Sequence, residues 1–156
     1  MRTVRTALAG WARSRRAHLD DSGSGAAAVI IFAFVFLALA AFVIDGGLSI
    51  SQRERAADIA EQAARFAAQD IDREALYVGE GGAAPINFQN CDARVSEFAR
   101  ELGLSGPDIA ASGCTAASAQ QVEVEISLTY HPILTGMFYK SALTVSGRAT
   151  AESIAG

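Results

Sequence analysis

Two cysteines are the residues whose type and spacing point most clearly to one chemistry in this 156-residue chain. Cys91 and Cys114 are 23 positions apart, which is wrong for a thioredoxin-type pair and too sparse for a zinc site. In an oxidising compartment an even cysteine count favours a disulfide. A bridge between them would contribute about 3 kcal/mol in the chain-entropy model. The alternative is two unpaired thiols.

Groups suited to catalysis are few. The only histidines are His18 and His131, and neither lies in a nucleophile-elbow or H-E-x-x-H motif. The glycine-rich stretch 79–82 lacks the strand-to-helix context of a phosphate-binding loop. The sequence therefore predicts no catalytic site, metal site, cofactor or small-molecule substrate. A membrane-tethered hydrolase using His131 is the enzymatic hypothesis that remains.

The element that must position the rest of the chain is an apolar run. Apolar residues make up 51% of the sequence, and mean hydropathy is +0.23. Residues 26–44 are 19 consecutive positions without a charge, amide, hydroxyl or proline. As a helix they would be about 28 Å long, close to the thickness of a bilayer's hydrocarbon core. We expect an uncleaved transmembrane helix over 25–45; a cleaved signal peptide and a buried core helix are the alternatives.

Charge on the two sides of this run predicts its orientation. Five arginines and two aspartates precede it, for a net charge of +3, and the remainder of the chain carries −7. Basic flanks stay in the cytoplasm. We therefore expect a cell-membrane protein with a cytoplasmic N-terminus and an extracytoplasmic C-terminal domain. The acidic balance gives no indication of a nucleic-acid partner.

The remaining patterns predict an α+β protein in four parts: a basic segment 1–24, the span 25–45, a helical stalk 46–78 and a small domain 79–156. Apolar residues at helical spacing indicate a helix from Ser49 to about Glu74. A second helix is expected over 93–102, capped by Asp92 and ended by Gly103. Gly46-Gly47 lies between the apolar run and this helix, and glycine is unfavourable inside a helix. The pair is interpreted as a hinge, a close-packing point or a frayed helix end.

Alternating apolar and polar residues indicate two strands, over 121–131 and 142–152, which together form an antiparallel hairpin. Its connection is unusually apolar for a loop, with Ile133, Leu134, Met137, Phe138 and Tyr139. The loop either caps the core or contacts a membrane or partner surface. Near the N-terminus, Trp11 lies in a stretch (1–16) that is either an amphipathic helix on the inner leaflet or a disordered basic tail.

The sequence from Gly25-Ala26, through the apolar run to Val43-Ile44-Asp45-Gly46-Gly47 and the Arg-, Gln- and Ala-rich helix after it, resembles the TadE/TadG-like proteins of tight-adherence (Flp) pilus assembly. The resemblance covers about residues 22–70. It implies a non-enzymatic, pseudopilin-like membrane component whose partners are the lipid bilayer and other pilus-assembly or secretion subunits. The competing hypothesis is a membrane-tethered extracytoplasmic binding or sensor module.

Family members that a prepilin peptidase processes carry glycine at the cleavage point and glutamate five residues later. Gly25 and Ala26 fit as the processing site, but Ile30 stands at the glutamate position. We therefore predict that the mature chain begins at Met1 or Arg2 and that it is closer to the anchored, TadG-like members.

Overall fold

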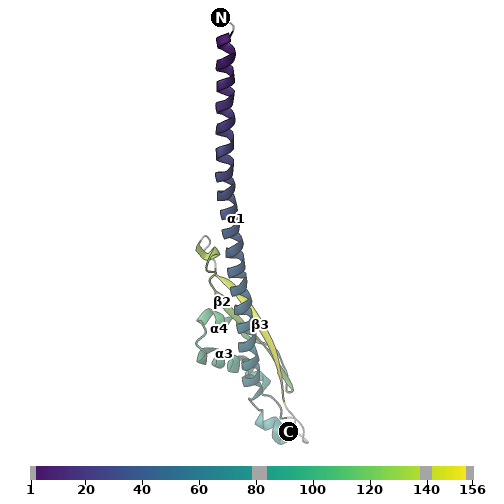
Figure 1. The fold of residues 1–156 in the computed structure, drawn as a ribbon. Coiled ribbons are helices and arrows are strands. Elements are labelled where there is room, and N and C mark those ends of the chain that lie inside the picture. The colour runs from purple at the N-terminus through teal and green to yellow at the C-terminus, as the bar shows by residue number, and fades with distance from the viewer. Residues whose placement is uncertain (1–2, 79–83, 138–141, 154–156) are drawn as a thin grey trace. The chain divides into compact units, whose positions relative to one another are not determined.

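A computed structural model describes the backbone of residues 3–78, 84–137 and 142–153, and the side chains of 24–78, 84–136 and 142–153. Its elements follow one another along the chain (Figure 1): α1 (Thr3–Ala68), α2 (Arg73–Val78), the 3-10 turn η1 (Phe88–Asn90), α3 (Cys91–Glu101), α4 (Gly106–Ala110), β1 (Gly113–Ala117), β2 (Gln121–Tyr130), the 3-10 turn η2 (Thr135–Met137) and β3 (Leu143–Glu152). The α+β class, with a long N-terminal apolar helix, is confirmed.

Contacts divide the chain into two compact units, residues 1–43 and 44–156. The first unit is helical from Thr3 onward. The polar, glycine-containing residues 20–25 would suit a flexible break, but α1 runs through them without interruption. That stretch has no proline, so every backbone N–H remains available for helical hydrogen bonding. Within the described residues, α1 is the one helix long and apolar enough to cross a membrane.

The second unit contains a three-stranded antiparallel sheet in the order β1-β2-β3. β2 and β3 pair along ten residues each, from Gln121 opposite Glu152 to Tyr130 opposite Leu143. This is the predicted hairpin. The third strand, β1, was not predicted; it pairs with the other edge of β2 and has a register irregularity between Cys114 and Ala116. Its residues, Gly-Cys-Thr-Ala-Ala, have no alternation of large apolar and polar side chains.

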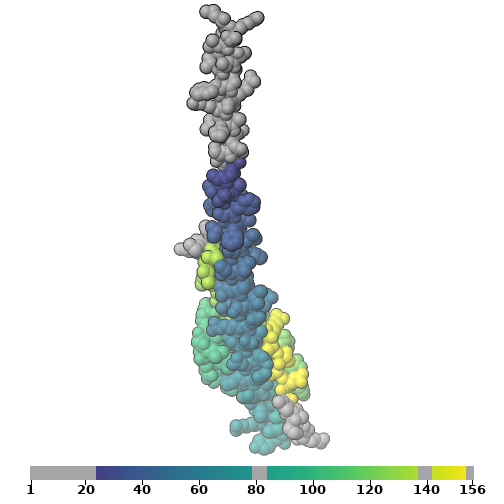
Figure 2. Space-filling model, in the orientation of Figure 1, coloured from purple at the N-terminus to yellow at the C-terminus, as the bar shows by residue number. Residues whose placement is uncertain are grey.

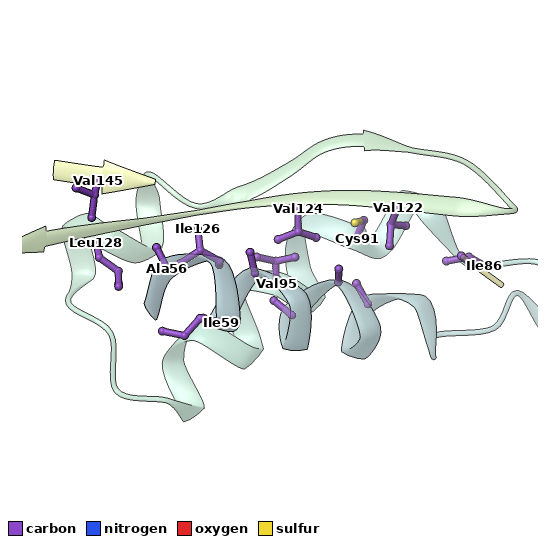
Figure 3. Close-up of a cluster of buried hydrophobic side chains, with 14 of the residues drawn as sticks. Ala56, Ile59, Ile86, Cys91, Val95, Val122, Val124, Ile126, Leu128 and Val145 are labelled. Atoms are coloured by element: carbon purple, nitrogen blue, oxygen red, sulfur yellow. The ribbon is translucent and has the colours of Figure 1, made fainter. Parts of the chain in front are cut away.

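The core lies between the sheet and the helices, as Figure 3 shows. Alternate residues of β2 are buried, which confirms the predicted inward face: Val122, Val124, Ile126, Leu128 and Tyr130. The facing stripe of α1 is made mainly of small residues: Ala56, Ile59, Ala60, Ala63, Ala64 and Ala67. α3 adds Val95, which is fully buried. Small side chains on α1 allow the sheet to approach the helix closely.

The closest approach is at Gly147 in β3. A Cβ atom there would lie 2.2 Å from the backbone nitrogen of Ala57 and 2.5 Å from the carbonyl carbon of Ala56. Only glycine fits such a contact with helix backbone. The predicted inward face of β3 is confirmed at Val145 and Gly147, which are buried, but Leu143 at the strand's start is exposed.

The stalk helix is shorter than predicted. α1 ends at Ala68, and the chain from Asp70 to Asp72 pairs instead with residues 85–87. The N–H of Asn87 donates to the Asp70 carbonyl at 2.7 Å, and the N–H of Asp72 donates to the Pro85 carbonyl at 2.9 Å. These long-range hydrogen bonds replace the helical ones that the local pattern favoured.

The second predicted helix begins two residues early, at Cys91. Asp92 does not cap it, because its carboxylate accepts the backbone N–H of Cys114 at 2.8 Å. Gly103 ends it as predicted, with a φ of +72° that favours glycine. The short helix α4 follows directly, and Ser105 caps it by accepting the N–H of Asp108.

Candidate functional site

The most unusual polar arrangement of the second unit is centred on Asp45, the residue that directly follows the apolar run. Its Oδ1 accepts the backbone N–H of Ile133 at 3.0 Å and that of Leu134 at 3.1 Å. Its Oδ2 accepts both the N–H and the hydroxyl of Thr135, each at 2.7 Å. Four donors from the hairpin connection therefore hold one carboxylate, which we name the Asp45 clamp.

Local geometry explains why the loop offers these donors. Pro132 ends strand pairing after β2, and the 3-10 turn η2 begins at Thr135. The first N–H groups of a helical turn have no partner within the turn. A carboxylate is a strong acceptor for such groups. Asp45 therefore acts as a cap supplied from about 90 positions earlier in the chain.

Some apolar residues of this loop fit a cap on the core, and others fit a contact with a membrane or partner surface. Pro132 is buried and Leu134 is half-buried, as a core cap requires, whereas the Ile133 side chain is 62% exposed. Figure 2 shows the yellow-green loop against the blue part of α1. The Met137 side chain, Phe138 and Tyr139 lie outside the described residues, so their predicted contact role stays a prediction.

The two cysteines are joined in a disulfide, as predicted, and the alternative of two unpaired thiols is wrong. Cys91 is the first residue of α3 and is buried, while Cys114 lies in β1. The bridge therefore attaches a helix to the edge strand of the sheet. The hydrogen bond from the Cys114 N–H to Asp92 reinforces the same junction.

The other predicted positions do not come together into a site. Gly25 and Ala26 lie in α1 and are exposed. Trp11 has a helical backbone, and its side chain lies outside the described residues. Gly46 and Gly47 lie inside α1, and a Cβ on either would meet nothing within 4 Å. Helix fraying is therefore wrong for this glycine pair, because α1 continues to Ala68. Close packing is not seen against the residues that the structure describes, and it stays a prediction together with the hinge.

Titratable groups of the described residues form no gathering of three or more His, Cys, Asp or Glu that could hold a metal ion. Among them, Glu125 has its pKa lowered, first by a hydrogen bond from the Ser146 hydroxyl and then by the Arg148 guanidinium. Arg148 Nε donates to Glu125 at 2.9 Å across the β2–β3 pair. This cross-strand pair is a structural feature of the sheet surface.

A surface hollow of about 310 Å³ lies where α1 ends, lined in part by Arg65, Gln69 and Ile71. That volume is at the lower limit of small-molecule pockets. The Arg65 guanidinium pairs with Glu61 one helical turn away, so it does not stand free for an anionic ligand. The hydroxyl of Ser153, which also lines the hollow, donates to the Ala84 carbonyl.

Comparison with known proteins identifies the segment that contains the apolar run and Asp45. Residues 23–70 match the family model of Flp pilus-assembly TadE/G-like proteins. This confirms the resemblance predicted over 22–70. The TadE/G-like segment begins just before the apolar run, includes the Asp45 clamp's carboxylate, and ends where α1 ends. No curated protein and no solved structure matches the chain.

The family model that matches describes Flp pilus-assembly proteins, and the match is confined to residues 23–70. β1, β2, β3 and the disulfide all lie beyond residue 70, outside the matched segment. The match therefore covers the helix, and the sheet domain lies outside it.

Proposed function

We propose that this protein is a non-enzymatic, single-pass, pseudopilin-like membrane component of a Flp/Tad-type pilus-assembly or secretion apparatus. The observation that carries the proposal is the family match at 23–70, which coincides with the apolar helix. In this role the helix anchors the protein, and the domain beyond residue 70 contacts other subunits of the apparatus.

In the proposed topology, residues 1–24 are cytoplasmic, 25–45 cross the membrane, and the stalk 46–78 and domain 79–156 are extracytoplasmic. The +3 charge before the apolar run supports a cytoplasmic N-terminus. The Cys91–Cys114 disulfide supports a domain on the oxidising side. The two arguments are independent, because one uses residues before the run and the other uses residues after it.

The proposed mature form is unprocessed. Gly25-Ala26 offers a cleavage point, but Ile30 provides no carboxylate to pair with a neighbouring subunit's new amino terminus. N-terminal sequencing of the protein isolated from its host membrane should start at Met1 or Arg2. A start at Ala26 would contradict this and indicate a processed pseudopilin.

Deleting the gene in its host tests the function. Electron microscopy of the deletion strain should show loss of Flp-type pili, and surface adhesion should fall. The wild-type gene in trans should restore both. A matched control is the His131→Ala variant, which removes the remaining catalytic candidate and should restore them equally. Intact pili in the deletion strain would overturn the proposal, and failure of His131→Ala alone would favour an enzyme.

A further inference from the structure

We propose that the loop 132–137, held by the Asp45 clamp, rests on the outer surface of the membrane and places the Ile133 side chain in the phospholipid interface. The inference rests on the proposed function, in which residues 26–44 cross the bilayer. It adds a second membrane contact, made by the sheet domain and separate in sequence from the anchor.

The depth of the loop follows from Asp45. The apolar run ends at Ile44, and its 19 residues span about the full hydrocarbon thickness. Asp45 is therefore expected at the level of the phospholipid headgroups. The N–H groups of residues 133–135 lie within 2.7–3.1 Å of its carboxylate. The loop is consequently placed at the same level.

The Asp45 clamp also lowers the cost of placing both the carboxylate and the loop N–H groups close to lipid. A carboxylate close to hydrocarbon is unfavourable unless hydrogen bonds compensate it. Here four donors do so. Conversely, backbone N–H groups cannot approach lipid unless they are satisfied. Asp45 satisfies the N–H groups of Ile133, Leu134 and Thr135 together, so this part of the loop can face lipid.

The exposed Ile133 side chain indicates what kind of surface contacts the loop. The Ile133 side chain is 62% exposed although its backbone N–H donates to Asp45, while its neighbours Pro132 and Leu134 are buried and half-buried. Because Asp45 directly follows the apolar run, an apolar side chain held beside this carboxylate is expected at the membrane surface. The occupant we assign is the headgroup–acyl boundary of a phospholipid bilayer. Another protein subunit at this place is the competing outcome.

The test uses full-length protein reconstituted in phosphatidylcholine vesicles whose acyl chains are brominated close to the headgroup. Trp11 is the only tryptophan, so Trp11→Phe provides a silent background. Ile133→Trp reports on the loop. Tyr77→Trp, at an 88% exposed position in α2, is the matched control, and Phe36→Trp in the middle of the apolar run reports on the anchor. Circular dichroism melting verifies that each variant folds.

We expect bromine to quench Ile133→Trp at least twofold more than Tyr77→Trp. Adding Asp45→Ala to Ile133→Trp should reduce the quenching toward the control, while Asp45→Asn, which keeps an acceptor oxygen, should retain part of it. Equal quenching of Ile133→Trp and Tyr77→Trp would overturn the inference. So would an Ile133→Trp emission protected from both bromine and aqueous iodide, which would indicate a protein contact.

The Phe36→Trp variant distinguishes failure of the loop contact from failure of the proposed membrane span. If lipids brominated deep in the acyl chains quench Phe36→Trp, while lipids brominated close to the headgroup leave Ile133→Trp unquenched, the loop contact is wrong and the anchor stands. If Phe36→Trp is itself unquenched, the proposed span is wrong and the loop inference falls with it.

Discussion

Two stretches of the same helix α1, residues 26–44 and 56–67, meet different surroundings. The first is apolar on every side and exposed throughout most of its length. The second has one buried stripe of small residues, while charged side chains such as Glu61 and Arg65 occupy the opposite face. Backbone conformation is the same in both. The side-chain pattern therefore distinguishes the two parts: the first suits the lipid of the proposed span, and the second packs against protein on one side.

Introducing arginine into the first stretch should impair membrane insertion, whereas introducing it into the second should impair folding. These are the largest effects we expect. Phe36→Arg together with Leu39→Arg should cost about 5–7 kcal/mol of membrane insertion, at about 2.5–3.5 kcal/mol for each arginine near the helix centre. Ala60→Arg places an unpaired charge in the core and should cost about 3–5 kcal/mol of folding stability. Carbonate-resistant membrane fractions and thermal melts measure the two effects.

Each variant is the control for the other. The double arginine variant should leave the domain's melting transition in place, and Ala60→Arg should leave the protein in the membrane fraction. If Ala60→Arg released the protein from the membrane, or if the double variant unfolded the domain, the two stretches would not be independent in the way described.

The disulfide lies within the sheet domain, so its removal should affect folding stability and not membrane association. Cys91→Ala with Cys114→Ala should lower the free energy of unfolding by about 3 kcal/mol, because the bridge no longer restricts the unfolded chain. Chemical denaturation followed by circular dichroism measures this. Membrane association should be unchanged. Reduction of the wild-type protein should reproduce the loss, and a reduced protein as stable as the oxidised one would contradict it.

Gly147→Ala tests how closely the sheet must approach the second stretch. The added methyl group would overlap the backbone of Ala56 and Ala57, so we expect a loss of about 1–3 kcal/mol. Gly106→Ala is the matched control, because a Cβ there meets nothing within 4 Å. Equal melting temperatures for the two variants would show that α1 and β3 are not in close contact.

Between the two stretches lie Gly46 and Gly47, where an added Cβ would meet no atom of the described residues within 4 Å. Replacing both with alanine should stabilise this part of the helix by about 1 kcal/mol per position. Amide hydrogen exchange at residues 44–50 should slow accordingly. If the pair is a hinge, the same variant should fail to restore pili in the deletion strain, and full restoration would make a hinge unnecessary.

The smallest effect concerns the sheet surface. The pKa of Glu125 is lowered in the folded protein, so its ionised form contributes stability above the unfolded value of about 4.5, and this is lost as pH falls through the folded pKa. The melting-temperature difference between wild type and Glu125→Gln should therefore shrink between pH 7 and pH 3. A difference that grows on acidification would have the wrong sign.

Patterns that repeat over short distances were readable from the sequence. The apolar run, the alternation of β2 and the glycine after α3 each depend on neighbours within a few residues. Features that depend on distant partners were not. Asp45 binds residues 88–90 positions away, and α1 ends where residues 85–87 compete for its backbone. β1 was missed for the same reason, since its pairing with β2 rather than its composition makes it a strand.

Selective labelling of amines would test the central claim, a membrane-spanning helix with its N-terminus inside and its domain outside, most directly. Lys140 is the only lysine in the chain, so the protein has one amine on each side of the proposed membrane. An impermeant amine reagent applied to intact spheroplasts, followed by peptide mass spectrometry, should modify Lys140 and leave the amino terminus unmodified. After detergent lysis both should react, and Lys140→Arg should remove the first signal. Labelling of the amino terminus in intact spheroplasts, with Lys140 protected until lysis, would contradict the account.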